Sequence, residues 1–262
     1  MTFAVIVQAR MGSSRCPGKV MMDLGGEPFL KRCLDRCDRI PGTDFVVVAV
    51  PDLPQDDPVA KAADSWGYAV VRGSETDVLA RYAKAAREVH ADAVMRVTSD
   101  CPMIDPEICG ETIRFWQQSG ADYGCNNMPP GFPHGLDCEV FDADALFAAE
   151  ELAVLPYERE HVTPWIRTNA KMKRSSIQGP GGGMEKLRWT LDYPEDVEMF
   201  RAIYEEMGDA APFASAADYL ALCLRRPDIP ALNQNRHDPA RLQSEQIADI
   251  RNDTMMLRTE AA

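Results

Sequence analysis

The first twenty residues combine a buried strand with a cationic, glycine-containing loop. Residues 3–7 (FAVIV) are an unbroken apolar run, which is typical of a strand buried on both faces of a parallel sheet. The next segment carries Arg10, Arg15 and Lys19, and no acidic residue occurs before Asp23. Parallel α/β sheets bind their ligands at the carboxyl ends of strands. The pattern therefore predicts an α/β fold with an anion-binding loop after its first strand.

The loop has the composition of a polyphosphate-binding loop, but it does not match the pattern of the common ATP-binding loop. Gly12 and Gly18 allow close backbone approach, and Ser13 and Ser14 add donors. Five residues separate the two glycines, where an ATP-binding loop has four, and Val20 replaces the hydroxyl that would bind magnesium. The dinucleotide pattern G-x-G-x-x-G is also absent from this turn. The alternative is a solvated basic surface loop.

Bulk properties exclude several classes of protein. The chain has 262 residues and a formal net charge of −13, which argues against nonspecific nucleic-acid binding. No stretch approaches the ~18 apolar residues of a membrane helix, and the first residues lack a signal-peptide pattern, so we expect a cytoplasmic protein. The eight cysteines include no C-x-x-C pair, so small buried thiols are expected rather than a zinc site.

Strand and helix patterns alternate along the first half of the chain, which predicts a parallel sheet covered by helices on both faces. Expected strands lie at 3–8, 45–50, 68–72 and 93–98, and later at 171–177 and 186–192. Expected helices lie at 28–39, 57–66, 76–89, 106–118, 194–207 and 213–225. Short strands at 121–141 and a helix-rich segment at 142–169 lie between them. We expect one domain over 1–230, with an insertion at about 125–180, and a partly mobile tail over 231–262.

Two aspartates are candidate ligands for a metal ion. Asp100 follows the strand expected at 93–98, on the sheet edge that carries Arg10, and Asp192 ends the strand expected at 186–192. Mg²⁺ prefers oxygen ligands and keeps several waters, so one or two carboxylates with substrate phosphates suffice. The alternative is that each aspartate caps the helix that follows it.

Six segments, in order along most of the chain, resemble the cytidylyltransferase family. The family-like segments are VQARMGSSRCPGKV at 7–20, RGSETDVLARY at 72–82, RVTSDCP at 96–102, GLDCEVF at 135–141, REHVTP at 159–164 and RWTLDYPED at 188–196. The chain looks most like the SpsF-like branch of spore-coat polysaccharide biosynthesis. The CMP-KDO and CMP-sialate synthetases are more distant relatives.

The resemblance implies a Rossmann-like, mostly parallel sheet of the nucleotide-diphospho-sugar transferase type, with a small inserted subdomain for substrate binding and dimerisation. It implies a Mg²⁺-dependent enzyme that transfers CMP from CTP to a sugar acid or related small anionic acceptor, releasing pyrophosphate, for surface polysaccharide or glycoconjugate synthesis. The implied catalytic residues are Arg10, Arg15, Lys19 and Asp100, and the implied metal ligands are Asp100 and Asp192. The implied nucleotide-binding residues are Gln8, Ala9, Arg10, Gly12, Ser13, Arg15, Lys19, Arg72, Gly73, Ser74, Asp77, Thr98 and Ser99.

The same resemblance implies an acceptor pocket and a homodimer formed through residues 125–180. The implied pocket residues are His134, Asp137, Glu139, Arg159, His161 and Arg188. Asp137 and Glu139 are two apart, so an extended backbone points them to one face. The alternative for these pocket residues is a salt-bridge network that ties the insertion to the core. For the implied nucleotide residue Arg72, the alternative is a surface ion pair with Glu75 or Asp77. SDCP at 99–102 replaces the GDEP of keto-acid synthetases, which argues against KDO as the acceptor.

Three other functions remain open on the sequence. One is a nucleotide-sugar-dependent glycosyltransferase, because Asp142-Ala143-Asp144 matches the D-x-D metal-binding motif in sequence. The second is a cytidylyltransferase acting on a phosphonate or another non-sugar acid. The third is a nonenzymatic nucleotide-binding module, against which the retained cations and aspartates argue.

Overall fold

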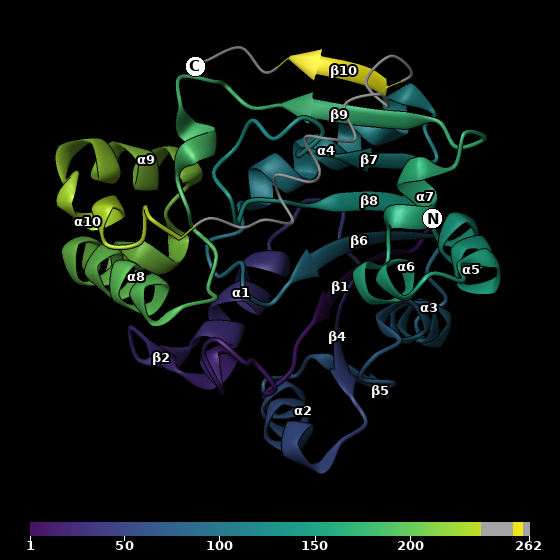
Figure 1. The fold of residues 1–262 in the computed structure, drawn as a ribbon, viewed down its shortest axis with the longest axis horizontal. Coiled ribbons are helices and arrows are strands. Elements are labelled where there is room, and N and C mark those ends of the chain that lie inside the picture. Colours follow the sequence, from purple (N-terminus) through teal and green to yellow (C-terminus); the bar gives the residue numbers. More distant parts are fainter. Residues whose placement is uncertain (237–253, 259–262) are drawn as a thin grey trace.

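The computed structural model describes residues 1–236 and 254–258. These residues contain an eight-stranded sheet with the order β10-β9-β7-β8-β6-β1-β4-β5 (Figure 1). The strands are β1 (Phe3–Gln8), β4 (Phe45–Pro51), β5 (Ala69–Gly73), β6 (Ala93–Thr98), β7 (Tyr123–Cys125), β8 (Glu139–Asp142), β9 (Arg174–Gln178) and β10 (Thr254–Arg258). Within the described part of the chain, β8 alone runs antiparallel to its neighbours in this sheet. The mostly parallel sheet predicted from the sequence is therefore confirmed.

Helices cover both faces of the sheet (Figure 1). One face packs against α1 (Phe29–Cys37), α2 (Asp57–Ser65) and α4 (Pro106–Ser119). The other packs against α3 (Val78–Glu88), α5 (Ala143–Leu152) and α7 (Pro164–Thr168), with α6 (Pro156–His161) beside α3. A third core surrounds α8 (Pro194–Met207), α9 (Ala216–Arg225) and α10 (Asp228–Ala231), and includes Leu24 of the small hairpin β2 (Asp23–Leu24) and β3 (Glu27–Pro28). None of the helices in the described ranges is long and apolar enough to cross a membrane.

Strand β1 is buried on both faces, as its unbroken apolar run predicts. Val5 and Val7 pack in the same core as Leu34 of α1, whereas Ala4 and Ile6 pack in the core of α3. Because β1 lies between β4 and β6, its carboxyl end opens between neighbouring strand ends rather than at a margin of the sheet. The loop after β1 therefore starts where an α/β sheet binds its ligand.

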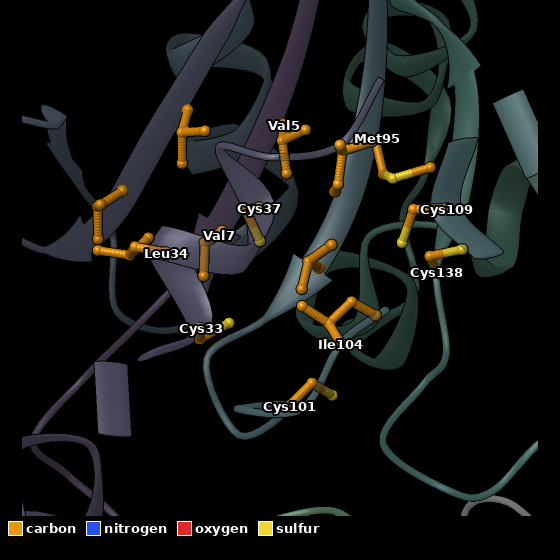
Figure 2. Close-up of a cluster of buried hydrophobic side chains, with 14 of the residues drawn as sticks. Val5, Val7, Cys33, Leu34, Cys37, Met95, Cys101, Ile104, Cys109 and Cys138 are labelled. Atoms are coloured by element: carbon orange, nitrogen blue, oxygen red, sulfur yellow. The ribbon is translucent and has the colours of Figure 1, made fainter. Parts of the chain in front are cut away.

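Thiols fill part of the core between the sheet and α1 and α4. Figure 2 shows Cys33 and Cys37 on α1, with Cys109 and Cys138 close to each other near Met95. All eight cysteines are buried and free. A hydrogen bond with Cys138, together with burial, raises the pKa of Cys109 well above its ordinary value. These thiols act as small apolar side chains, as the sequence predicts.

The prediction of a strand at 186–192 is wrong. Residues 184–186 form the short helix η3 (Met184–Lys186), and the extended residues after it make one isolated bridge, between Arg188 and His134. Their backbone bonds go to loops: Trp189 N donates to His134 O (2.6 Å) and Leu191 N donates to Asp100 O (2.8 Å). Trp189 and Leu191 are buried in the third core. The apolar pattern thus reflects burial against loops rather than pairing in the sheet.

The second half of the chain completes the same sheet. The segment 125–180 contributes β8 and β9 to it, together with α5, α6 and α7. The helix expected at 213–225 begins at Ala216, after the short helix η4 (Gly208–Phe213). Within the expected tail, β10 pairs in parallel with β9. The expected mobility of that tail falls largely on residues 237–253 and 259–262, which lie outside the described residues.

Candidate functional site

A cavity of about 1020 Å³ opens at the carboxyl ends of β1 and β6. Its walls come from the loop after β1, the β5–α3 connection, the end of β6, helix α6 and the segment before α8. The lining residues are Gln8, Ala9, Arg10, Gly12, Ser13, Ser14, Arg15, Lys19, Val20, Glu75, Thr76, Asp77, Val78, Arg81, Thr98, Ser99, Asp100, Pro156, Arg159, Glu160, His161 and Asp192.

The loop after β1 folds around the carbonyl of Met11. That oxygen accepts hydrogen bonds from Ser13 N (2.9 Å) and Gly18 N (3.2 Å). Gly18 has φ 69°, a left-handed conformation that glycine adopts without steric cost, and it starts the short helix η1 (Lys19–Met21). Met11 N donates to the fully buried Asp56 (2.6 Å). The loop is therefore held in shape before any ligand binds, and Asp56, which the sequence did not single out, anchors it.

Lys19 joins the two candidate metal ligands. Its ammonium lies 3.0 Å from Asp192 Oδ1 and 3.7 Å from Asp100 Oδ2, and it also donates to the carbonyl of Leu191. The residue is only 9% exposed, so water screens these contacts weakly. The first loop, the end of β6 and the segment before α8 therefore converge on one ammonium group.

Asp192 is surrounded by cations. Arg15 Nη2 donates to its Oδ1 (2.7 Å), and Arg188 Nη2 donates to its Oδ2 (3.1 Å). Burial alone raises the pKa of Asp192, but Lys19, Arg15 and Arg188 outweigh burial and hold the pKa below its ordinary value. Arg188 also binds Asp196 through two hydrogen bonds of 2.9 Å. Asp192 is thus a fixed carboxylate, and it holds Arg15 and Lys19 at the cavity.

Asp100 is the more open of the two aspartates. Its side chain is 28% exposed; Thr98 donates to Oδ1, and Lys19 lies 3.7 Å from Oδ2. No cluster of three or more metal-ligating side chains occurs within residues 1–236 and 254–258. Two nearby carboxylates nevertheless fit a magnesium ion that also binds phosphate oxygens, because such ions need few protein ligands. Of the two carboxylates, that of Asp100 is the more accessible, and Lys19 contacts both.

The other side of the cavity is formed by the start of α3 and by α6. Asp77 caps α3 by accepting from Ala80 N (2.9 Å), and its carboxylate also binds the guanidinium of Arg159 (Nε to Oδ1, 3.0 Å). The implied nucleotide residue Asp77 and the implied acceptor residue Arg159 therefore form an ion pair. His161, at the end of α6, is an exposed residue of the same wall.

The structure places three of the expected nucleotide residues outside the cavity lining. Arg72 turns toward Asp57 and donates to the carbonyls of Pro51 (3.0 Å) and Leu53 (2.8 Å), rather than pairing with Glu75 or Asp77. Gly73 and Ser74 also lie outside the lining. Ser74 accepts a hydrogen bond from Arg81 through its carbonyl (2.6 Å).

Several expected acceptor residues form structural networks instead of lining the cavity. Glu139 is 3% exposed and accepts from Arg96 (2.6 Å), Tyr123 (2.6 Å) and Thr163 (2.7 Å). Burial raises its pKa, but Arg96 and Arg167 with these hydroxyls bring the pKa below its ordinary value. The contacts match the salt-bridge alternative for this residue.

His134, Asp137 and Arg188 also lie outside the lining, whereas Arg159 and His161 belong to it. Asp137 accepts from Gly135 N (3.0 Å), and His134 Nδ1 lies 3.5 Å from Arg188 Nη1. Asp142, the first aspartate of the D-x-D letters, ends β8 and precedes α5, and neither it nor Asp144 lines the cavity. The metal-motif interpretation of that triplet has no support in the geometry.

The cavity also contains residues that the sequence did not single out. These are Thr76, Val78, Arg81, Pro156 and Glu160; Ser14, Val20 and Glu75 also line the cavity, and of these Ser14 was expected as a donor of the loop. A usable signal existed for one of them. Arg81 follows Asp77 by four residues on the predicted helix, so both lie on one helix face within the family-like segment 72–82.

Comparisons with known proteins bear on the family and the fold of this chain. A family model described as cytidylyltransferase matches residues 4–209. The spore coat polysaccharide biosynthesis protein SpsF of Bacillus subtilis is 33% identical over 230 residues, covering 85% of this chain and 94% of that protein. A solved cytidylyltransferase from Leptospira borgpetersenii superposes with a TM-score of 0.83 at 29% identity, covering 91% of this chain and 99% of that one. A CMP-KDO synthetase solved with CTP shares the fold (TM-score 0.57, 19% identity, covering 79% and 99%).

Proposed function

The chain belongs to the cytidylyltransferase family, and on that basis we propose that it transfers CMP from CTP to a small anionic acceptor and releases pyrophosphate. The observation that carries the proposal is that Lys19 pairs with both Asp100 and Asp192, and Arg15 with Asp192, at one cavity. Cations there suit a triphosphate, and carboxylates beside them suit the metal ion that accompanies it. Binding of CTP by the CMP-KDO synthetase of the same fold supports CTP as the donor.

In this reaction an oxygen of the acceptor attacks the α-phosphorus, and the bond to the β-phosphate oxygen breaks as pyrophosphate leaves. Negative charge grows on the phosphoryl oxygens and on the leaving group. Arg10, Arg15 and Lys19 lie on the cavity wall where they can stabilise that charge. The preformed loop around Met11 keeps them in place, so little reorganisation is needed during the step.

Asp100 and Asp192 are the residues that would hold a magnesium ion. When bound, the ion supplies Lewis-acid stabilisation of phosphate oxygens. Asp192 has a second role that needs no metal, because its carboxylate orients Lys19 and Arg15 toward the cavity. Asp100 is oriented by the hydroxyl of Thr98.

We further propose that the acceptor is a sugar acid or a related acid and that the product serves surface polysaccharide or glycoconjugate synthesis. The similarity to SpsF supports this role, and Arg159 and His161 offer cationic or hydrogen-bonding groups on the cavity wall. A phosphonate or other non-sugar acid has the same charge and is the alternative acceptor. A cytoplasmic location is part of the proposal, because nucleoside triphosphates are made there.

A homodimer through residues 125–180 is likewise proposed. Exposed apolar side chains gather between α5 and α6, namely Leu152, Val154, Leu155 and Tyr157. Val154 is the most exposed of them, at 83%, and a group of neighbouring exposed apolar side chains is a candidate contact surface for a second copy. Light scattering of the purified chain tests this, and a monomer at micromolar concentration would contradict it.

One experiment tests the catalytic proposal. The purified chain is incubated with Mg²⁺, a panel of sugar acids and phosphonates, and ATP, GTP, CTP or UTP, and pyrophosphate release is measured. Release that requires both CTP and one acceptor supports the proposal. In a parallel incubation with nucleotide sugars, consumption of one without triphosphate would indicate a glycosyltransferase instead. Binding without turnover across the panel would indicate a nonenzymatic module.

A further inference from the structure

A buried asparagine from the C-terminal part of the chain reaches the network that surrounds Asp192. Asn233 follows α10 and lies beyond residues 4–209, the range that the family model matches. The residue is only 2% exposed. Its amide nitrogen donates to the carbonyl of Arg188 (3.0 Å) and to Oδ1 of Asp196 (2.8 Å). Because that nitrogen carries two hydrogens, both donors are used, on residues that lie on either side of Asp192 in the sequence.

Asp196 holds both the backbone and the side chain of Asp192. Its side chain is fully buried, and its Oδ2 accepts from the backbone N–H groups of Asp192 (2.8 Å) and Tyr193 (2.9 Å). Arg188 Nη2 donates to Asp196 Oδ2 (2.9 Å) and also to Asp192 Oδ2 (3.1 Å). A shift of the Asp196 carboxylate would therefore move the backbone and the side chain of Asp192 together.

The fold also fixes Asn233 from its own side. Figure 1 shows α10 beside α8, and Ile229 of α10 is buried in the third core. The carbonyl of Asn233 accepts from Arg236 N (3.0 Å), which closes the turn after α10. The amide of Asn233 is therefore presented to Asp196 from an ordered support, as a group that positions another must be.

Charge balance by itself does not require Asn233. Arg188 already pairs with Asp196 through two hydrogen bonds of 2.9 Å, and two backbone N–H groups bind the same carboxylate. The amide of Asn233 is neutral, so it adds direction rather than charge. It joins the Asp196 carboxylate to the backbone of Arg188, so that the two partners of Asp192 are held in one arrangement.

We propose that Asn233 is a positioning residue for nucleotidyl transfer, a role that rests on the proposed function. It acts through Asp196 and Arg188 on Asp192, whose carboxylate holds Lys19 and Arg15 at the cavity. Stabilisation of the transition state depends on the alignment of such cations, and a displacement of about 1 Å can cost about 100-fold in rate. A segment beyond the family-matched part of the chain thus sets the alignment of the cations in the site.

The test measures kcat and KM for CTP in pyrophosphate release, with the acceptor that gives the highest wild-type turnover in the panel above. Asn233→Ala loses both donors but no charge. We expect its kcat to fall by roughly 10- to 100-fold, the usual cost of removing a partner that orients a site carboxylate, with little change in KM. Asn235→Ala is the matched control, because Asn235 is an exposed asparagine of the same segment, and it keeps the wild-type kcat.

Amide hydrogen exchange gives a readout that does not depend on the reaction. In Asn233→Ala we expect faster exchange in the peptide 188–196, where the N–H groups of Asp192 and Tyr193 bind Asp196. Exchange in β1 and β6 is expected to stay at the wild-type rate. If Asn233→Ala does not fold, Asn233→Ser keeps one donor and is expected to change kcat and exchange in the same directions.

Three results overturn the role of Asn233. An unchanged kcat, with or without a lower thermal midpoint, would make the residue structural only, and a higher KM at constant kcat would assign it to substrate binding. Unchanged exchange over 188–196 would show that it does not hold Asp196. A wild-type protein that releases no pyrophosphate with any triphosphate and acceptor would instead overturn the proposed function, and the exchange over 188–196 would still decide whether Asn233 fixes this segment.

Discussion

Lys19 and Asp192 form a buried ion pair of 3.0 Å across 173 positions of sequence. The pair ties the loop after β1 to the segment that precedes α8, and Arg15 and Arg188 bind the same carboxylate. The cations proposed to stabilise the transition state are therefore held by a carboxylate before substrate arrives. This relationship makes Asp192 important to the site whether or not it binds a metal ion.

Lys19→Met is expected to lower the rate of pyrophosphate release by about 100- to 1000-fold, the usual loss for one charge-stabilising donor. Folding is expected to survive, because Arg15 and Arg188 still neutralise Asp192. Lys61→Met is the control, since the Lys61 side chain is 81% exposed on α2. A Lys19 variant with a normal rate would remove this residue from catalysis.

Asp100→Asn is expected to abolish turnover while leaving the thermal midpoint within a few degrees of wild type. Asparagine keeps the shape of the side chain but loses the charge that a metal ion requires. Asp64→Asn, at an exposed position of α2, is the matched control. Turnover at the wild-type rate in Asp100→Asn would end the assignment of this residue as metal ligand.

The ion pairs of Asp192 predict a pH dependence of stability. Its pKa is depressed in the folded protein, so its stabilising effect is fully present above its unfolded pKa of about 4 and is lost as pH falls through the folded value. The difference in unfolding free energy between wild type and Asp192→Asn should therefore be large at pH 7 and shrink below pH of about 4. Urea unfolding across pH 2 to 7 measures it, and a difference that stays constant over this range would contradict the prediction.

Glu139→Gln is expected to act on stability rather than on acceptor binding. Removing the charge leaves the largely buried Arg96 and Arg167 without their carboxylate, which costs about 3 kcal/mol or more. Chemical denaturation measures that loss, and Glu88→Gln at an exposed position of α3 is the control. An increased KM for the acceptor with unchanged stability would instead return Glu139 to the acceptor site.

The elements that the sequence predicted well are those whose pattern is local. The apolar run of β1 and the alternation through β6 are confirmed because periodicity and burial are properties of neighbouring residues. The same logic failed at 186–192. The buried Trp189 and Leu191 produce the apolar pattern of a strand, although their backbone hydrogen-bond partners lie in loops. Burial can be inferred from such a pattern, but the pairing partner cannot.

In the candidate site, too, the sequence pattern identified the segment but not the spatial partners of its side chains. Arg72 and Arg81 belong to one family-like segment, and the sequence favoured Arg72. The structure turns Arg72 toward Asp57 and places Arg81 on the cavity wall. Glu139, expected beside an acceptor, is enclosed by Arg96 and hydroxyls of distant segments. Each outcome depends on which charges lie nearby in space, and no spacing along the chain specifies that.

The sequence by itself determined the mostly parallel α/β sheet, the cationic loop after its first strand and the family. Tertiary structure alone decided that Lys19 lies between Asp100 and Asp192 and that Asp56 anchors the loop. The physical reason is the range of the forces involved. Helix and strand preferences act between neighbours in the chain, whereas an ion pair depends on a distance of a few ångströms between side chains that folding brings together.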